Sequence, residues 1–301
     1  MTLELRLVHE PDIPIEAEVL NPSILAGKDL EEIASLPVWQ GNRCLHLDDF
    51  FEIDGAAGRT AADTTVRIEG NLRDVKMIGA NMDGGKIEVH GDVGMYLAAR
   101  MRAGRVHVFG SVASWAAAEM EGGNIQIEGD AGDYLCAALR GSMQGMRGGR
   151  VYVTGSVGNM MAANMRRGFI VVGGDVGEMA AAGMQGGTII VGGSVGTGVG
   201  THATRGLLII LGKARSLMPT YLYSGTAPNE FIPYYLRYVE SRHPGLLPHV
   251  GYKQLWIKYQ GDFAEHTPRM EIYTRAETDY AETQSQWLVL QYDLVEPVEP
   301  W

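Results

Sequence analysis

A nineteen-residue repeat occupies the middle of this chain and limits what it can fold into. Copies of the unit KIEVHGDVGMYLAARMRAG begin at Lys86, Arg105, Asn124, Arg150, Phe169 and Thr188. The copy at Asn124 carries seven additional residues near positions 138–145, a looser copy begins at Thr65, and a truncated copy begins at Leu207. A fixed period of this length is typical of a solenoid with one supersecondary unit per repeat. We expect the insertion to form a surface loop.

Each unit begins with a segment that predicts a β-strand. Counting the first residue as zero, offsets 1 and 3 are aliphatic or β-branched in every copy, while offsets 0, 2 and 4 are polar in the early copies. This alternation is typical of a strand with one buried face. Glycine follows at offset 5, as Gly91, Gly110, Gly129, Gly155, Gly174, Gly193 and Gly212. A glycine at a fixed phase predicts a corner that needs a positive φ or a close approach of backbone to backbone.

Two further columns predict a narrow core. Small residues stand at offset 12, as Ala98, Ala117, Cys136, Ala162, Ala181 and Gly200. Methionines follow as Met101, Met120, Met146, Met165 and Met184. Residues at one phase of a solenoid stack along its axis, so these methionines are interpreted as a core ladder and not as a metal site. Cys136 is interpreted in the same way, as a small buried side chain and not as a nucleophile.

Nineteen residues are too few for a helical hairpin with its turns, but they suit one coil of short strands and glycine corners. The sequence therefore predicts an all-β fold, a right-handed parallel β-helix in which each coil adds about 4.8 Å along the axis. We expect residues 65–212 to form this β-helix, residues 1–64 to cap its first coil, and residues 213–301 to form a mixed α/β extension. Within the extension, the pattern predicts a helix over Phe231–Arg242 and strands over residues 252–260 and 286–294.

The outward positions change character in the last copies of the repeat. They become apolar at Phe169, Ile190, Leu207, Ile209 and Leu211. An apolar outer face on a solenoid has to be covered. The candidates are the aromatic-rich extension of the same chain and a partner subunit, and these five residues form the candidate partner interface.

Composition excludes several classes of function. The formal net charge is −11, which leaves no positive excess for nucleic acid or an anionic membrane. The two cysteines form no CxxC pair, and the eight histidines show no metal-binding spacing. The Gly196–Gly200 run is explained by the repeat and opens no helix, so we do not interpret it as a dinucleotide loop. We expect no catalytic, cofactor-binding or metal-binding residue on this chain. No signal peptide or apolar run of membrane-spanning length is evident, which favours a cytoplasmic protein.

The repeat resembles a known family. The phase G-x-x-G-x-x-x-A followed by M-x-x-G, in stretches such as GSVGNMMAANMRRGFIVVGGDVGEMAAAGMQGGTIIVGGSVG, is similar to the C subunit of formylmethanofuran dehydrogenases. The similarity covers roughly residues 40–240, including the run from Pro219, and is specific because a long register of the repeat is kept. The glycine-repeat domain at the C-terminal end of the glutamate synthase large subunit resembles it more distantly. The long aromatic extension looks most like the C subunit of the bacterial formyltransferase/hydrolase complex of methylotrophs.

This resemblance implies a structural role in an enzyme complex of one-carbon metabolism. The bacterial complex would move formyl groups from formyl-tetrahydromethanopterin to a methanofuran-like carrier and hydrolyse them to formate. Its chemistry, metal and carrier would lie on an amidohydrolase-like subunit and a formyltransferase subunit, and the hetero-oligomer would also contain a dehydrogenase-B-like subunit. One alternative is the C subunit of a molybdenum or tungsten formylmethanofuran dehydrogenase. Another is an autonomous β-helical binding module that uses the surface around residues 138–145.

Overall fold

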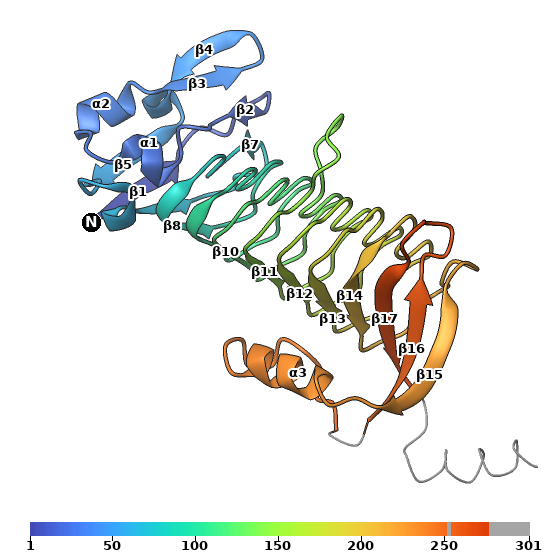
Figure 1. The fold of residues 1–301 in the computed structure, drawn as a ribbon. Helices are drawn as coiled ribbons and strands as arrows, with labels where there is room; N and C mark the ends of the chain where they lie inside the picture. The colour runs from blue at the N-terminus through green and yellow to red at the C-terminus, as the bar shows by residue number, and fades with distance from the viewer. Residues whose placement is uncertain (252–253, 277–301) are drawn as a thin grey trace, which may run out of the picture.

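The computed structural model describes residues 1–251 and 254–276, and most of its regular structure is strand in one large, mainly parallel sheet (Figure 1). The repeat supplies the centre of this sheet as β6 (Thr65–Glu69), β8 (Asp83–His90), β9 (Ala103–Val108), β10 (Asn124–Ile127), β11 (Arg150–Val153), β12 (Phe169–Val172), β13 (Thr188–Val191) and β14 (Arg205–Ile210). Each strand pairs in parallel with the strand of the next copy. The expected all-β character is confirmed.

The register of the repeat is kept across the insertion. Ile125 pairs with Val151 although 26 positions separate them, and Val151 pairs with Ile170 after 19. A second column of single bridges runs beside the strands, from Leu72↔Val93 through Val176↔Val195. Each copy therefore stacks on its neighbours at two places, and the seven additional residues leave both columns in phase.

The methionine column and a glycine column interlock between coils. All five predicted methionines are fully buried. In each coil, a glycine stands three positions after the methionine and has a positive φ, as at Gly123 (+90°) and Gly187 (+106°). A Cβ on Gly123 would lie 2.7 Å from Cε of Met101, and a Cβ on Gly187 would lie 2.6 Å from Cε of Met165. Each methionine methyl group thus fills the space that a side chain on the next coil would need, which explains the M-x-x-G pattern.

The corner glycines are required by close approach, not by their φ angles. Of the seven predicted corners, only Gly91 has a φ in the left-handed range, at +151°. A Cβ on Gly110 would lie 2.5 Å from the carbonyl oxygen of Gly91, and one on Gly193 would lie 2.6 Å from that of Gly174. These corners stack backbone on backbone, with Gly193 N–H donating to Gly174 O at 3.0 Å. Of the two alternatives that the sequence offered, close approach therefore applies at the other six corners.

Positive φ angles occur instead at non-glycine residues before each methionine. In one coil they are Tyr96 (+64°), Ala98 (+51°) and Arg100 (+57°). The backbone N–H groups of Tyr96 and Arg100 donate to the following coil, and that of Ala98 donates to Ile78 O of the preceding coil at 2.8 Å. Such conformations cost about 1–2 kcal/mol per residue. Hydrogen bonds to both neighbouring coils offset that cost, because all three of these backbone N–H groups find a partner.

A ladder of alternating aspartate and serine stabilises the corners at these glycines. The column directly after the corner glycines consists of Asp92, Ser111, Asp130, Ser156, Asp175 and Ser194. Each side-chain oxygen accepts the backbone N–H of the next residue in the column, for example Ser111 N–H to Asp92 Oδ1 at 2.8 Å and Asp130 N–H to Ser111 Oγ at 3.0 Å. Alternation keeps two carboxylates from lying in adjacent coils, where they would repel each other.

The N-terminal residues pair with the first coil. β1 (Thr2–Leu7) lies between β6, to which it is parallel, and β5 (Phe51–Gly55), to which it is antiparallel. A small second sheet has the order β4 (Arg43–His46), β3 (Pro37–Gln40), β2 (Ile15–Glu16), β7 (Val75–Lys76). Helices α1 (Pro22–Leu25) and α2 (Leu30–Ala34) and the 3-10 turns η1 (Leu47–Asp49) and η2 (Ala61–Asp63) complete this region. η1 separates β4 from β5, and the Asp49 carboxylate accepts the His46 N–H at the start of this turn.

The C-terminal region extends the sheet at its other end. β17 (Arg269–Arg275) is parallel to β14, followed by β16 (Leu255–Gly261) and β15 (Leu222–Pro228), both in antiparallel pairings. Helix α3 (Ile232–Glu240) crosses the outer face of the sheet (Figure 1), within the predicted helical range. The strand expected over 252–260 is described from Leu255, and the one expected over 286–294 lies outside the described residues. In the described part of the chain, no helix is long and apolar enough to cross a membrane.

Candidate partner-binding surface

The apolar outer face of the late coils is covered by the chain's own C-terminal region. Val171, Ile190 and Ile209 are fully buried and form one row across β12, β13 and β14. Over them lie four buried residues of α3, β16 and β17, namely Ile232, Val239, Trp256 and Tyr273. Of the two candidates for covering this face, the structure shows the extension of the same chain.

This arrangement corrects the predicted partner interface. Ile190 and Ile209 are 0% exposed and Leu211 is 4% exposed, so these three side chains are not available to a partner. Phe169 and Leu207 are half-buried and pack against the same cluster. The sequence identified a face that needs a cover, but the residues at its centre stabilise the chain itself.

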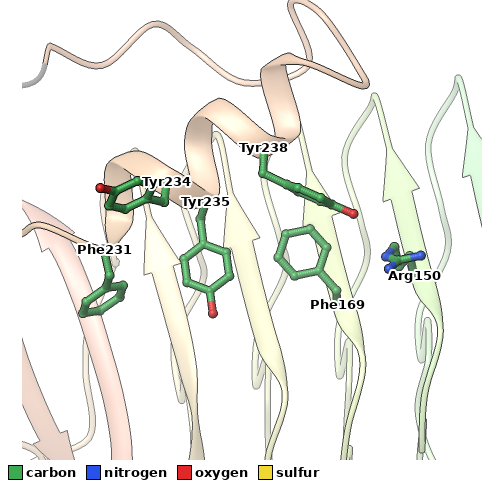
Figure 2. Close-up of a pocket in the computed structure, with 6 residues that line it drawn as sticks. All are labelled: Arg150, Phe169, Phe231, Tyr234, Tyr235 and Tyr238. Carbon is green, nitrogen blue, oxygen red and sulfur yellow. The ribbon is translucent and has the colours of Figure 1, made fainter.

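At one margin of this covered face lies an aromatic groove of about 510 Å³ (Figure 2). The residues that line it are Arg150, Phe169, Phe231, Tyr234, Tyr235 and Tyr238. Four of them come from α3 and its N-cap, while Arg150 and Phe169 come from β11 and β12. The ring centroids of Phe169 and Tyr235 lie 6.0 Å apart, and those of Tyr235 and Phe231 lie 6.2 Å apart. The groove thus presents a row of rings with one guanidinium group at its end.

Two further arginines of this region stack on the tyrosines of α3. The Arg237 guanidinium lies 5.2 Å from the Tyr234 ring centre, and that of Arg242 lies 4.2 Å from the Tyr238 ring centre. Such contacts hold cationic groups beside aromatic rings without neutralising their charge. The groove therefore combines aromatic surface with a positive margin on a chain whose net charge is −11.

The outer face of the early coils is polar and carries ion pairs. Arg67 lies 3.3 Å from the Glu88 carboxylate, and His107 lies 2.8 Å from that of Glu128. A hydrogen bond from the Lys86 ammonium, with a weaker one from Arg67, holds the pKa of Glu88 below its ordinary value. Burial opposes the ionisation of Glu128, but hydrogen bonds from His107 and other neighbours still lower its pKa. The polar side chains of this face are compatible with contact to solvent or to a polar partner.

Apolar side chains are exposed at two other places. Phe109 is 46% exposed on the early coils and stacks between His90 (centroids 4.4 Å apart) and His107 (4.0 Å). The insertion projects from the coils as a loop (Figure 1), and its Met143 is 71% exposed. At the base of the loop, the backbone N–H of Leu139 donates to the Glu119 carboxylate at 3.3 Å. Each of these places offers an isolated apolar side chain, and they do not form one continuous apolar surface.

Two features with chemical potential can be located in the described residues, a buried cysteine and a group of candidate metal ligands. Cys136 is fully buried, and burial raises the pKa of its thiol, which disfavours a nucleophilic thiolate. Within residues 1–251 and 254–276, the one group of three candidate metal ligands is His46, Asp48 and Asp49, all exposed. Asp49 already accepts the backbone N–H of His46 at 2.8 Å, so its carboxylate has a structural role at the start of η1.

Comparison with known proteins places this chain among relatives. No family model matches it. A segment of 86 residues is 46% identical to the C subunit of molybdenum-containing formylmethanofuran dehydrogenase 1 of Methanosarcina barkeri, and covers 29% of each chain. A segment of 91 residues is 38% identical to the C subunit of tungsten-containing formylmethanofuran dehydrogenase 2 of Methanothermobacter thermautotrophicus, covering 30% of this chain and 34% of that one. The matches thus span about a third of these curated relatives.

A solved structure extends the similarity to nearly the whole chain. It is a chain of the formyltransferase/hydrolase complex (FhcABCD) from Methylorubrum extorquens in complex with methylofuran. The TM-score is 0.81 at 31% identity, over 91% of this chain and 100% of that one. This chain belongs to the family of formylmethanofuran dehydrogenase C subunits. The more distant resemblance to glutamate synthase stays a prediction.

Within this member of the C-subunit family, the sequence located some surface residues and missed others. The aromatics of α3 were expected to cover the repeat or to reach a partner, and the structure shows that they cover it. Arg150 was not singled out, because offset 0 is also basic at Lys86 and Arg105, and nothing local distinguishes it. The helical spacing of Phe231, Tyr234, Tyr235 and Tyr238 was the one signal for the groove.

Proposed function

We propose that this chain is a non-catalytic structural subunit of a complex that transfers formyl groups from formyl-tetrahydromethanopterin to a methanofuran-like carrier and hydrolyses them to formate. The observation that carries this proposal is the structural similarity over the full length of a chain from the formyltransferase/hydrolase complex, at 31% identity and a TM-score of 0.81. Matches over only about a third of the curated dehydrogenase subunits are weaker support for their activity.

The shape that suits this role is a rigid rod. We infer that the stacked repeats of residues 65–212 wind as a right-handed parallel β-helix, capped by residues 1–64 and extended by residues 213–301. Parallel strands of successive coils and the second column of bridges support this interpretation. A solenoid offers long, nearly flat faces on which several subunits can be positioned.

The partners would carry the chemistry. In this proposal an amidohydrolase-like subunit, a formyltransferase subunit and a dehydrogenase-B-like subunit assemble with this chain into a cytoplasmic hetero-oligomer, and the metal and the carrier bind to the partners. The uncovered polar face of the early coils and the projecting loop with Met143 are the surfaces available for such contacts. The buried thiol of Cys136 supports a structural rather than a chemical role.

A second candidate follows from the curated relatives. Their names state molybdenum-containing and tungsten-containing dehydrogenases, and the identity reaches 46% in the matched segment. In that case the chain would be the same kind of scaffold, with molybdenum or tungsten and iron–sulfur clusters on its partners.

Purification of the tagged chain from its native host distinguishes the two. We expect amidohydrolase-like and formyltransferase-like proteins to co-purify without molybdenum or tungsten, and the complex to release formate from formyl-tetrahydromethanopterin when the carrier is present. Molybdenum or tungsten in stoichiometric amounts would establish the dehydrogenase instead. Recovery of the chain alone would overturn both proposals and favour an autonomous binding module.

Surface variants sharpen the same experiment. Phe109→Asp on the early coils and Met143→Asp on the loop each place a charge at an exposed apolar position without disturbing the core. Leu30→Asp, at a position 40% exposed in the N-terminal region, is the matched control. Loss of a partner with one of the first two, but not with Leu30→Asp, would identify the contact surface.

A further inference from the structure

The aromatic groove has features of a peptide-binding site. Its rings form a row from Phe169 through Tyr235 to Phe231, and the row continues to Tyr273, whose ring centroid lies 5.6 Å from that of Phe231. Tyr234 is 68% exposed beside the row. Grooves lined with aromatic side chains are a recurring recognition mode for Pro-x-x-Pro segments, because rings pack well against the flat faces of proline.

The charge of the groove selects for an acidic segment. Arg150 lines it. Arg237 and Arg242 stack on two of its tyrosines, Tyr234 and Tyr238. Arg150 has a distant hydrogen bond of 3.5 Å to Asn124, and Arg237 and Arg242 bond to the Pro233 carbonyl and the Ser241 hydroxyl. Within the part of the chain that the structure describes, none of the three forms an ion pair with a carboxylate. Carboxylates on a ligand would therefore find unpaired guanidinium groups.

The chain itself contains a segment of matching chemistry. Residues 277–301 include six acidic residues and no lysine or arginine. Residues 295–301 read Val-Glu-Pro-Val-Glu-Pro-Trp, which is a Pro-x-x-Pro motif with a glutamate before each proline and an aromatic residue after the second.

We propose that the aromatic groove binds an acidic Pro-x-x-Pro segment, and that residues 295–301 of the same chain are this segment. The connection is long enough, because residues 277–294 span up to roughly 60 Å when extended. The described chain reaches Ala276, three residues after Tyr273, which stands at the near end of the row of rings. Proline suits the faces of the rings, and the two glutamates complement the arginines in charge.

A competition experiment tests this proposal. A fluorescein-labelled peptide Val-Glu-Pro-Val-Glu-Pro-Trp is titrated with the full chain and with a variant that stops at residue 294, and binding is followed by fluorescence anisotropy. A tethered segment acts at an effective concentration near the millimolar range, so we expect the shortened variant to bind the peptide about tenfold more tightly than the full chain. The full-length double variant Pro297→Ala/Pro300→Ala should behave like the shortened one.

Charge variants link the binding to the groove. In the shortened chain, Arg150→Glu should weaken peptide binding by about tenfold, because one favourable charge contact becomes repulsive. The matched control is Arg140→Glu, an exposed arginine on the loop of the insertion, which should leave binding unchanged. Added salt should weaken the wild-type interaction, since the charges are exposed.

Three results would overturn the proposal. Failure of the peptide to bind the shortened chain would show that the groove does not recognise this chemistry. Equal binding to the full and shortened chains would show that residues 295–301 do not occupy it. A full chain that dimerises with concentration in sedimentation velocity, while the shortened chain stays monomeric, would show that the segment binds a second copy and not its own groove.

Discussion

The early and late coils share one interior and have opposite exteriors. Inside, both regions stack the same columns of methionine, small residues and corner glycines. Outside, the same row of the sheet is Glu88, His107 and Gln126 on β8, β9 and β10, but Val171, Ile190 and Ile209 on β12, β13 and β14. The first row is partly exposed, whereas the second is fully buried under β16, β17 and α3.

This difference separates two roles within one repeat. The interior columns determine that a coil forms, since the fit between adjacent coils depends on them. The outward positions are free to vary, and their polarity determines where a segment outside the repeat can pack. Substitutions inside should therefore have similar effects in both regions, and substitutions outside should not.

The largest expected effect is at the corner glycines, and it should be the same in both regions. In Gly110→Ala and Gly193→Ala, the new Cβ would lie 2.7 Å from the carbonyl carbon of the glycine in the preceding coil. Backbone atoms cannot move aside as side chains do, so each change should lower the free energy of unfolding by about 3 kcal/mol. Chemical denaturation measures both.

The control for these variants is Gly141→Ala. Gly141 lies in the loop with a φ of +84°, and nothing lies within 4 Å of its Cβ position. Only the cost of a left-handed alanine remains, about 1 kcal/mol. A large loss at Gly193 with a small one at Gly110 would contradict the idea of a common interior.

The second prediction separates the exteriors. Ile209→Lys buries an ammonium group beneath Trp256 and Tyr273, which should cost about 3 kcal/mol or release the C-terminal region from the sheet. The equivalent change in the early coils is Gln126→Lys, at a half-buried position, and it should cost less than about 0.5 kcal/mol.

Hydrogen exchange measures where the effect of Ile209→Lys falls. We expect amides of β16 and β17 to lose protection, while those of β8, β9 and β10 keep it. If β17 stays protected in the variant, the apolar row does not hold the C-terminal region, and the comparison between the two exteriors would fail.

Much of the repeat could be predicted from the sequence because its constraints are local and occur in every copy. A strand, a corner and a buried methionine recur in each unit, so one correct interpretation applies to all. The exceptions are informative. Positive φ angles at Tyr96 and Trp115 were not expected, since bulky residues disfavour them, and hydrogen bonds between coils override that preference.

The C-terminal region was harder to predict because its contacts are long-range and occur once. β17 pairs with β14 across about sixty residues, and no repeat in the sequence indicates the register of this pairing. The aromatic groove combines Arg150 of β11 with the tyrosines of α3, about eighty positions later. The helix was predictable from its spacing, but the strand on which it lies was not.

A smaller effect is expected from the ladder of aspartates and serines. Asp92 accepts the Ser111 N–H and pairs with Arg73 at 2.6 Å, and these contacts lower the pKa of its carboxyl. A carboxyl whose pKa is lowered by folding stabilises the protein at pH values above its ordinary pKa of about 3.9. This stabilisation is lost as the pH falls from that value to the pKa of the folded state. Asp92→Ala should cost about 1 kcal/mol at pH 7 and less near pH 3.

The matched variant for this prediction is Asp92→Asn. The amide oxygen can still accept the Ser111 N–H, so only the charge is removed, and the loss at pH 7 should be a fraction of that in Asp92→Ala. Urea unfolding at both pH values measures the two variants. Equal losses would mean that the carboxylate charge, and not its hydrogen bond to the next coil, matters at this corner.

The smallest effect is expected at the boundary between the two exteriors. His243 follows α3 and stacks on Tyr152 of β11, with ring centroids 3.9 Å apart. Burial lowers the pKa of His243, and Arg242 and His107 lower it further, against the opposing carboxylate of Glu128. The docked state thus favours the neutral ring, so its stability is complete above the ordinary pKa of about 6.5 and falls as the pH decreases through that value.

Docking of α3 should therefore weaken between pH 7.5 and pH 5.5, by a few tenths of a kcal/mol because the ring is still partly solvated. Hydrogen exchange of α3, compared with that of β9 as an internal reference, measures this change. In His243→Gln the dependence on pH should disappear, since glutamine does not titrate. If the wild-type dependence persists in that variant, a group other than His243 sets the response of this region to pH.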